Sequence, residues 1–376
     1  IEFSDWSSDV CSSDLMDTAT DPPAISAAPQ TSHETKPAET GNGVCSFQTQ
    51  HTVPIRGLSI AKDGKVIIGD KKGWITLLDL REKSEVVVGK HASSMSQLGS
   101  DLGFIISSSY GGRIKCWKEG EETYQKKIVI PSSRSPILTF AIEGNHIFTA
   151  SNAKSAIYEF DLQDGSLLHS SATKLKHIES ICVVPSEDHV SVYAGCDSGL
   201  YLFSSTLDES TVVAGKGKSG AWSSCKSQRK GTAINVKEVK QVAYNGAGVI
   251  GVIGKLNNVW SLLEFLVDDS SLLSSRPIPI ALMRNKFTPF VGSMSAYRDF
   301  WVVLVEGGLF FFHQGDMTRS LSISLPDDTP DASCFTIADE TVYIGCVDGS
   351  CYTFPIDERI SVLWNRNVKT MDGEIA

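Results

Sequence analysis

The sequence lacks an uninterrupted apolar run of the roughly 18 residues that a transmembrane helix needs. The nearest approach, Phe300 to Phe312, is broken by Glu-Gly-Gly at 306–308. A secretory signal is also lacking, because Met16 is followed by Asp17 and a polar, proline-containing stretch instead of basic and then apolar residues. These absences predict a soluble protein that is neither secreted nor inserted in a membrane.

Cysteine is present nine times, but never in the Cys-x-x-Cys pair that marks many metal and redox sites. Most of the cysteines lie inside apolar runs, as Cys116, Cys182, Cys196 and Cys346 do. Such residues behave as small buried groups with free thiols, and thiols persist in reducing compartments. We therefore predict an intracellular protein, cytoplasmic or nuclear, without a disulfide scaffold.

Motifs for catalysis are lacking as well. The chain contains no Gly-x-Ser-x-Gly and no His-Glu-x-x-His, and none of its eight histidines lies at ligand spacing from another. Gly217-Lys218-Ser219 is similar to the end of a phosphate-binding loop, but Val212 stands where that loop needs glycine. We therefore expect no enzyme activity, no metal, no cofactor and no small-molecule substrate.

The net charge is −10, with 41% hydrophobic and 21% charged residues. An acidic chain repels nucleic acids and anionic membranes at long range, so contact with either needs a local basic patch. We expect no membrane contact. The hydrophobic share is enough for a large core in a chain of 376 residues.

The composition divides the chain into four parts. Residues 1–15 resemble translated adapter or vector fragments, so we expect them to be non-native and exclude them from the fold. Residues 16–43 are rich in Ser, Thr, Ala, Pro and Glu, which predicts a disordered tail. Residues 44–364 carry the folded domain, and 365–376 form a C-terminal tail.

A repeat occupies the folded part. Its units join an apolar run, a turn with Gly, Asp or Asn, and a second apolar run. The two clearest copies are VYAGCDSGLYLF at 192–203 and VYIGCVDGSCYTF at 342–354. The second runs begin at Gly73, Gly112, Ser155, Gly199, Asn258, Gly308 and Ser350, which are 39 to 59 residues apart.

The second runs alternate like β-strands. Two positions after each starting residue stands a large apolar side chain: Ile75, Ile114, Ile157, Tyr201, Trp260, Phe310 or Tyr352. Four positions after it the residue is apolar in six of the seven copies, Glu159 being the exception. A spacing of two puts both side chains on one face of a strand.

Each copy is preceded by an apolar first strand and followed by a weaker, more polar fourth strand. The predicted first strands are Ile55–Ile60, Ser94–Leu98, Ile137–Ile142, Ile178–Val184, Val239–Tyr244, Phe290–Met294 and Cys334–Ala338. Four short strands repeated about every 40–45 residues are the pattern of a propeller blade. The sequence therefore predicts an all-β fold, a single seven-bladed β-propeller of four-stranded antiparallel blades.

The repeats resemble those of the WD-repeat (Trp-Asp repeat) family, over roughly residues 44–364. At the dipeptide position, three copies keep an apolar-acidic pair, at 78–79, 160–161 and 263–264, and Trp117-Lys118 keeps the tryptophan. The family's Gly-His turn is echoed by Gly89-Lys90-His91 and, more faintly, by His51 and His177. The resemblance is to a degenerate member and implies a protein-binding propeller.

In this family one blade combines both ends of the chain, which closes the ring. Cys45–Gln50 is the candidate for the closing strand and would complete the seventh blade. The rival is Ile360–Trp364. The sequence leaves both open.

Three histidines recur near blade turns: His51, His91 and His177. We interpret them as structural, as buried hydrogen-bonding groups that link a turn to a neighbouring strand. A catalytic or metal role is the alternative, but such a group is needed once and not in several blades.

Residues 215–231 make one inter-repeat spacing too long. The stretch is rich in Gly and Ser and has no acid, which predicts a flexible loop insertion. It offers a candidate contact for phosphates or an acidic protein, through Lys216, Lys218, Trp222, Lys226, Arg229 and Lys230. The alternative is a solvated insertion without a role.

The turns between the second and third strands should share one rim of the ring. Loops on a rigid scaffold commonly carry binding residues, so the partner-binding candidates are Asp70, Tyr110, Asn152, Asp197, Glu306 and Asp348. Four of them are acids, which favours a basic peptide as partner. The alternative for each is a turn residue chosen for local hydrogen bonding.

These observations favour a non-catalytic scaffold or adaptor that binds protein or peptide partners through its rim loops. An alternative is an accessory subunit of an enzyme that processes or modifies nucleic acid, which the basic loop alone supports. A propeller hydrolase would need converging ionisable groups in the channel, and the sequence identifies none.

Overall fold

We describe the protein from a computed structural model. It describes residues 45–50, 52–118, 125–131, 136–151, 156–173, 175–186, 189–207, 210–215, 234–278, 294–305, 308–317, 320–325 and 331–356. These residues belong to one unit, Pro37–Ala376. The predicted segments 1–15, 16–43 and 365–376, and the basic loop beyond Gly215, lie outside the described residues.

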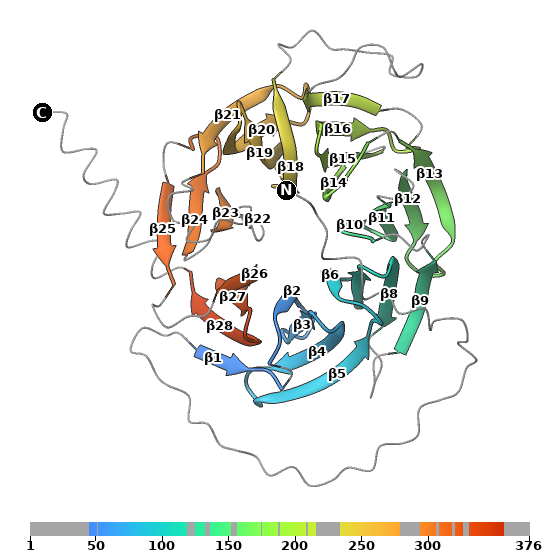
Figure 1. The fold of residues 1–376 in the computed structure, drawn as a ribbon, viewed down its shortest axis with the longest axis vertical. Helices are drawn as coiled ribbons and strands as arrows, with labels where there is room; N and C mark the ends of the chain where they lie inside the picture. Colours follow the sequence, from blue (N-terminus) through green and yellow to red (C-terminus); the bar gives the residue numbers. More distant parts are fainter. Residues whose placement is uncertain are drawn as a thin grey trace, which may run out of the picture. The chain divides into compact units, whose positions relative to one another are not determined.

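The described residues form seven four-stranded antiparallel sheets, which Figure 1 shows as the blades of a ring. The predicted seven-bladed, all-β propeller is therefore confirmed. No described segment forms a helix that is long and apolar enough to cross a membrane.

The strands follow the repeat in chain order. Blades one and two contain β2 (Ile55–Ile60), β3 (Val66–Asp70), β4 (Trp74–Asp79), β5 (Ser84–Lys90), β6 (Met95–Asp101), β7 (Phe104–Ser109), β8 (Arg113–Lys118) and β9 (Gln125–Pro131). Blades three and four contain β10 (Phe140–Glu143), β11 (His146–Ser151), β12 (Ala156–Asp161), β13 (Leu167–Ala172), β14 (Ser180–Pro185), β15 (Val190–Cys196), β16 (Gly199–Phe203) and β17 (Ser210–Gly215).

The remaining blades continue the same order. Blades five and six contain β18 (Val236–Tyr244), β19 (Val249–Leu256), β20 (Val259–Leu266), β21 (Leu272–Pro277), β22 (Met294–Tyr297), β23 (Phe300–Val305), β24 (Gly308–His313) and β25 (Ser320–Ser324). Blade seven contains β26 (Ala332–Ala338), β27 (Thr341–Cys346), β28 (Ser350–Pro355) and, from the other end of the chain, β1 (Cys45–Gln48). Of the predicted first strand of blade six, Met294 begins β22, and residues 290–293 lie outside the described residues.

The N-terminal strand closes the ring. β1 pairs antiparallel with β28, from Cys45 opposite Thr353 to Gln48 opposite Ser350, and lies on the outer side of β28 in Figure 1. Thr49 extends the seam, because its Oγ1 donates a hydrogen bond of 2.8 Å to the carbonyl oxygen of Gly349. Of the two candidates that the sequence left open, the N-terminal one therefore supplies the closing strand, and the rival segment 360–364 lies outside the described residues.

The core lies between blades and not at the centre of the ring. In β3, Val66 and Ile68 pack toward blade seven, while Ile67 between them packs toward blade two. This follows from the alternation of side chains along a strand. Seven clusters of buried side chains, one between each pair of neighbouring blades, repeat the arrangement around the ring. Both faces of the middle strands are covered, which explains why these strands read as nearly continuous apolar runs.

Polar side chains join the inner strands of adjacent blades. The side-chain amide of Gln97 on β6 accepts a hydrogen bond from Phe140 N at 2.8 Å and donates one to Phe140 O at 2.9 Å. Ser180 on β14 accepts a bond of 2.9 Å from Val242 N on β18. Backbone groups at the inner edge of each sheet have no ladder partner on that side, so these side chains satisfy them.

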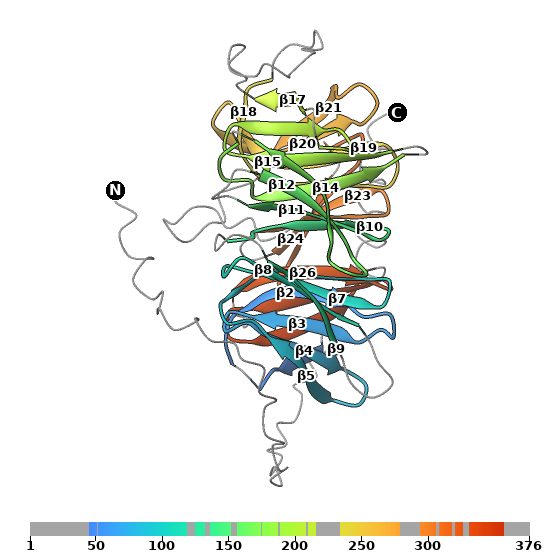
Figure 2. The same ribbon diagram turned by 90° about the vertical axis from the view of Figure 1, so that its right-hand side faces the viewer.

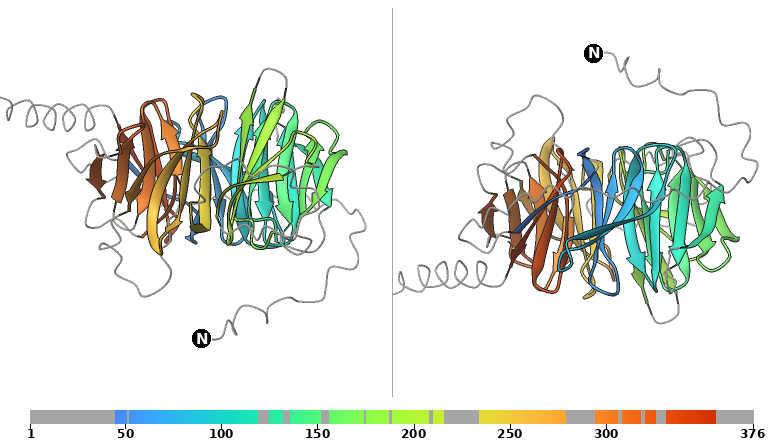
Figure 3. Two further views of the ribbon diagram at one scale, coloured as in Figure 1. Left: turned by 90° about the horizontal axis from the view of Figure 1, so that it is seen from above. Right: turned by 90° about the horizontal axis from the view of Figure 1, so that it is seen from below.

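The strands run between two rims, seen from the side in Figures 2 and 3. Rim A carries the turns between second and third strands together with the connections from one blade to the next. Rim B carries the turns between first and second strands and between third and fourth strands. The predicted partner-binding turns therefore lie on rim A.

Candidate functional site

Rim A contains the described members of the predicted binding set. These are Asp70 in blade one, Tyr110 in blade two, Asp197 in blade four and Asp348 in blade seven. Asn152 and Glu306 lie outside the described residues. The four come from separate turns of the ring, and they differ in how far they are accessible.

The Asp70 carboxylate is turned inward. The residue is only 4% exposed, and its Oδ1 accepts a hydrogen bond of 2.9 Å from Trp74 N across the turn. Gly73 completes this turn with φ +84°, and a Cβ there would lie 2.5 Å from Ser93 O. The turn therefore packs against the connection to blade two, and Asp70 performs the local bonding of a turn residue instead of facing a partner.

Tyr110 is the most exposed aromatic side chain in the described part of rim A, at 50%. Its backbone N donates a hydrogen bond of 3.0 Å to Ser94 O. The neighbouring Gly111 N donates one of 2.7 Å to Ser93 Oγ. These two hydrogen bonds fix the backbone of the turn at Tyr110 and Gly111. The large, amphipathic side chain of Tyr110 therefore extends into solvent from a rigid turn.

Asp197 and Asp348 are exposed acids in similar turns. Asp348 Oδ1 accepts hydrogen bonds from Ser350 N at 2.9 Å and from Ser350 Oγ at 2.6 Å. At Asp197 it is the backbone carbonyl that is engaged, by Glu238 N at 2.9 Å. Both carboxylates are accessible to a partner, although that of Asp348 also stabilises its own turn.

His91 lies beneath rim A, 1% exposed. Its Nε2 is hydrogen-bonded to Ser107 Oγ at 2.7 Å, and its ring meets Trp117 edge-on at 6.0 Å between centroids. Burial, reinforced by the charges of Lys115 and Arg113, lowers the pKa of His91 to about 4, against a smaller upward contribution from Ser107. The imidazole is neutral at physiological pH and links two blades.

The other two predicted histidines differ from His91. His177 is exposed and has a left-handed backbone with φ +53°. The structural interpretation as a buried link is therefore wrong for His177, because a faint echo of a turn motif does not determine which way the side chain points. His51 lies outside the described residues.

Glu159, the one acidic residue at an apolar repeat position, lies within ion-pair distance of two histidines. Its Oε1 lies 2.8 Å from His146 Nδ1 and its Oε2 lies 2.7 Å from His169 Nδ1. The three residues stand on β11, β12 and β13, so sequence spacing did not bring them together but strand pairing does. Among the residues that the structure describes, no group of three or more His, Cys, Asp or Glu side chains is arranged to hold a metal ion.

Rim A also carries exposed cations that the sequence analysis did not select. Lys71 and Lys72 follow Asp70 in its turn, Lys90 precedes His91, and Arg113 begins β8. All four belong to the turns or connections that define this rim. The signal was present in the sequence, because each basic residue directly adjoins a turn residue or histidine that the repeat had already identified. The predicted basic-loop contacts from Lys216 to Lys230 lie outside the described residues.

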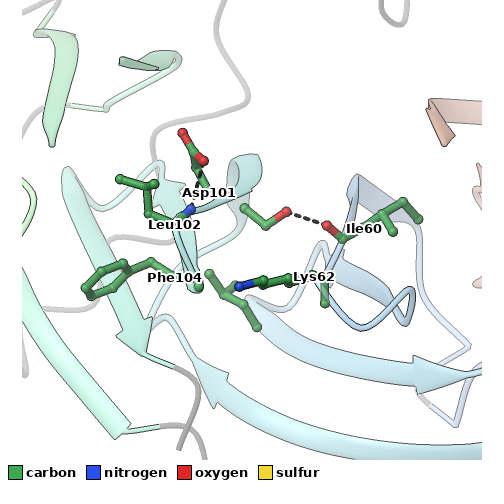
Figure 4. A pocket seen from close by; sticks show the side chains of 9 residues that line it. Ile60, Lys62, Asp101, Leu102 and Phe104 are labelled. Carbon is green, nitrogen blue, oxygen red and sulfur yellow. Dashed lines mark hydrogen bonds between the residues drawn. The ribbon is translucent and has the colours of Figure 1, made fainter. Parts of the chain in front are cut away.

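An open groove of about 510 Å³ lies on rim B between blades one and two. Figure 4 shows Ile60 and Lys62 from the end of β2 on one side, and Asp101, Leu102 and Phe104 from the β6–β7 turn on the other. Leu102 is 60% exposed. Within the part of the chain that the structure describes, this groove contains one lysine and one aspartate and no cysteine or histidine.

Comparison with known proteins supports the fold and no more. The structure is similar to the crystal structure of the computationally designed Ika8 protein, with a TM-score of 0.52 and 14% identity over 82% of this chain and 98% of that chain. No protein family profile matches the sequence. No curated protein sequence matches it either. At such an identity the likeness supports the fold alone, and the seven four-stranded sheets of the described residues define the chain as a seven-bladed β-propeller.

Proposed function

We propose that this protein is a non-catalytic scaffold or adaptor that binds protein partners through the loops of rim A. The observation that carries the proposal is the rigid presentation of Tyr110, Asp197 and Asp348 at separate turns of one rim. Rigid presentation lowers the entropy that binding must overcome. Separate turns offer a surface for a macromolecule instead of a pocket for a small ligand.

The environments of the perturbed titratable groups favour the same function. Burial raises the pKa of Cys116, Cys182 and Cys334 to about 12, so these thiols are protonated and poor nucleophiles. The lowered pKa of His91 belongs to a side chain that is closed off from solvent by Ser107 and Trp117. These pKa shifts follow from burial of the side chains in the core, and a scaffold needs no further role for them.

We further propose that the propeller is of the WD-repeat type. Its support is that two residues which carry the resemblance meet in space. His91, from the echo of the Gly-His turn, and Trp117, at the dipeptide position, form one assembly with Ser107. A Cβ at Gly89 would lie within 2.8 Å of the Trp117 ring, so that glycine is needed for the indole to pack there.

We propose an intracellular location, in the cytoplasm or nucleus. The thiols of Cys116, Cys182, Cys196, Cys334 and Cys346 are free and buried, which is typical of proteins from reducing compartments. The alternative function, as an accessory subunit of an enzyme acting on nucleic acid, has its sequence support in residues 215–231, nearly all of which lie outside the described residues.

The test uses affinity capture followed by a direct binding assay with each captured protein. Tyr110→Ala, Asp197→Ala and Asp348→Ala should each weaken binding several-fold, since truncation of rim contacts costs on the order of 1 kcal/mol or more at a minority of positions. The melting temperature of each variant should stay within about 2 °C of the wild type, as for most exposed positions.

Glu82→Ala is the matched control. Glu82 is exposed in the turn between the third and fourth strands of blade one, on rim B, and its replacement should leave binding unchanged. A partner whose affinity is unaffected by all three rim A variants, or an equal loss with Glu82→Ala, would overturn the proposal.

A further inference from the structure

A basic sector interrupts rim A at blades one and two. We define it as Lys71, Lys72, Lys90 and Arg113, all of which are exposed. In a chain whose net charge is −10, four cations gathered over two neighbouring blades make a local field of the opposite sign. The potential at such a patch acts over about a Debye length, roughly 8 Å at physiological ionic strength.

Hydrogen bonds hold the basic sector together. The connection that carries Lys90 is bonded to the turn that carries Lys71 and Lys72, through His91 N and Gly73 O at 2.8 Å. Lys115 Nζ on β8 donates to Lys90 O at 2.8 Å, and Lys90 Nζ lies 4.3 Å from the centre of the Trp74 ring. The cations therefore stand on one rigid platform, and Lys90 has lost part of its conformational freedom before any ligand arrives.

Carboxylates do not neutralise the basic sector within the described part of the chain. Elsewhere cations are paired, as Lys65 is with Asp63 at 2.7 Å and Lys255 with Glu238 at 2.7 Å. No described carboxylate lies within 4.0 Å of the charged atoms of the four sector residues. Asp70 is the nearest acid in sequence, but its carboxylate is buried and its Oδ1 is bonded to Trp74 N.

An aromatic side chain makes the basic sector suited to a peptide. Tyr110, half exposed between Lys90 and Arg113 in the order of the chain, offers an apolar face with a polar tip. An extended segment lying on blades one and two meets cations and an aromatic ring.

Acidic residues on either side of the basic sector limit the length of a negatively charged ligand that can bind there. On one side of the basic sector, blade seven presents Asp348, and further round the ring in the other direction blade four presents Asp197. A long polyanion such as a nucleic acid strand would have to pass over these acids and would be repelled there. A short acidic segment can satisfy the cations and end before the flanking acids.

We propose that the basic sector is the docking site for a short acidic segment, rich in Asp or Glu, of a partner protein. This inference rests on the proposed function and refines it, because it assigns the acidic partner chemistry to blades one and two. The acids of the predicted turns favoured a basic peptide, but of those that the structure describes only Asp197 and Asp348 are exposed.

The experiment measures binding of defined probes to the full chain by fluorescence anisotropy. The probes are a labelled peptide of alternating Glu and Leu, the same peptide with Lys in place of Glu, and a single-stranded oligonucleotide of equal negative charge. The Glu peptide should bind most tightly, and its affinity should fall as salt is added. Tighter binding of the Lys peptide or of the oligonucleotide overturns the proposal.

Variants locate the binding. The triple variant Lys72→Gln, Lys90→Gln and Arg113→Gln should weaken the Glu peptide by about tenfold or more and flatten the salt dependence, as charge removal at an interface does. If that variant unfolds, the double variant Lys71→Gln and Lys72→Gln replaces it, because both changes lie in one exposed turn. The double variant should also weaken binding of the Glu peptide and flatten the salt dependence. Unchanged affinity in a folded variant overturns the proposal.

The matched control makes the same change in charge on rim B, with Lys62→Gln, Arg81→Gln and Lys118→Gln, all exposed positions. It should bind the Glu peptide like the wild type, and an equal loss would show that net charge alone attracts the peptide and would overturn the proposal.

With captured partners, the proposed function and the acidic docking site can be tested separately. If Tyr110→Ala weakens a partner and the basic-sector triple variant does not, the proposed function stands and the acidic docking site falls.

Discussion

The indole Nε1 of Trp301 on β23 donates a hydrogen bond of 2.7 Å to Oε1 of Glu264 on β20, which joins blade six to blade five. Both residues are fully buried. The carboxylate also accepts bonds from Gly315 N at 3.0 Å and from Ser274 Oγ at 2.5 Å. A buried acidic group is costly unless its oxygens are satisfied, and here every bond comes from the same junction between two blades.

Replacing Trp301 with Phe should lower the free energy of unfolding by about 2–4 kcal/mol, because the buried carboxylate loses a donor and a small cavity is left. Chemical denaturation followed by intrinsic fluorescence or circular dichroism measures the change. Trp260→Phe is the matched control, since Trp260 is a buried indole in the same inter-blade cluster and makes no hydrogen bond to a carboxylate within the described residues. Equal losses for the two variants would contradict the role assigned to Glu264.

Stability should depend on pH through His91. Its folded-state pKa of about 4 is below the ordinary value of 6.5, so between these values the unfolded chain binds a proton that the folded chain does not. Stability therefore rises with pH across this window, and acidification from about pH 7 to pH 4 should remove up to about 3 kcal/mol.

The free energy of unfolding of wild type and His91→Gln, measured at several pH values, checks this expectation. The variant should be less stable at neutral pH and should lose less on acidification. His177→Gln, which removes an exposed histidine, is the matched control. A His91→Gln variant with the wild-type slope would show that other groups cause the acid sensitivity.

Ring closure by β1 should be essential for cooperative unfolding. Deletion of residues 45–48 removes the partner of β28 and exposes the edge of that strand, which then becomes available for pairing with another chain. We expect a broader and lower thermal transition together with soluble oligomers, measured by calorimetry and by light scattering.

Gln48→Ala is the control for that deletion, because it keeps the strand and loses only the side-chain bond of 3.0 Å from Nε2 to Asp348 O. Its transition should stay sharp and within about 2 °C of the wild type, as for most exposed positions. If the deletion variant melts like the wild type, another segment closes the ring.

The buried cysteines should resist alkylation while the protein is folded. Burial raises the pKa of Cys116, Cys182 and Cys334 to about 12 and that of Cys346 to about 11, and only the thiolate is reactive. Iodoacetamide labelling followed by peptide mass spectrometry should find these four unmodified in native protein and modified in denaturant. Rapid labelling of Cys182 in the native protein would show that blade four opens locally.

Much of the fold could be predicted from the sequence because the repeat is local. Each blade folds from consecutive strands, and two-residue alternation identifies the faces of a strand, so Ile75 and Trp260 were placed correctly without any long-range information. The closing strand was open between two candidates, since pairing of segments some 300 residues apart leaves no periodic signal. Pairing of β1 with β28 decided it.

The candidate site was less predictable, because accessibility depends on how a turn packs. Asp70 is the last residue of β3 and is buried against the connection to blade two, whereas Asp348 lies in the turn between β27 and β28 and is exposed. The repeat predicted an acid near each turn, but it did not determine whether that acid ended the strand or belonged to the turn. The same limit applies to Glu159, whose two histidine partners are brought to it by strand pairing.

By itself, the sequence determined that this chain is a ring of seven β-sheets, because periodic burial is encoded at neighbouring positions and repeated along the chain. Only the tertiary structure decided what the ring presents to a partner. Lys72, Lys90 and Arg113 come from three loops that bond to one another across two blades. Their common field arises from spatial proximity, which no single segment of the sequence specifies.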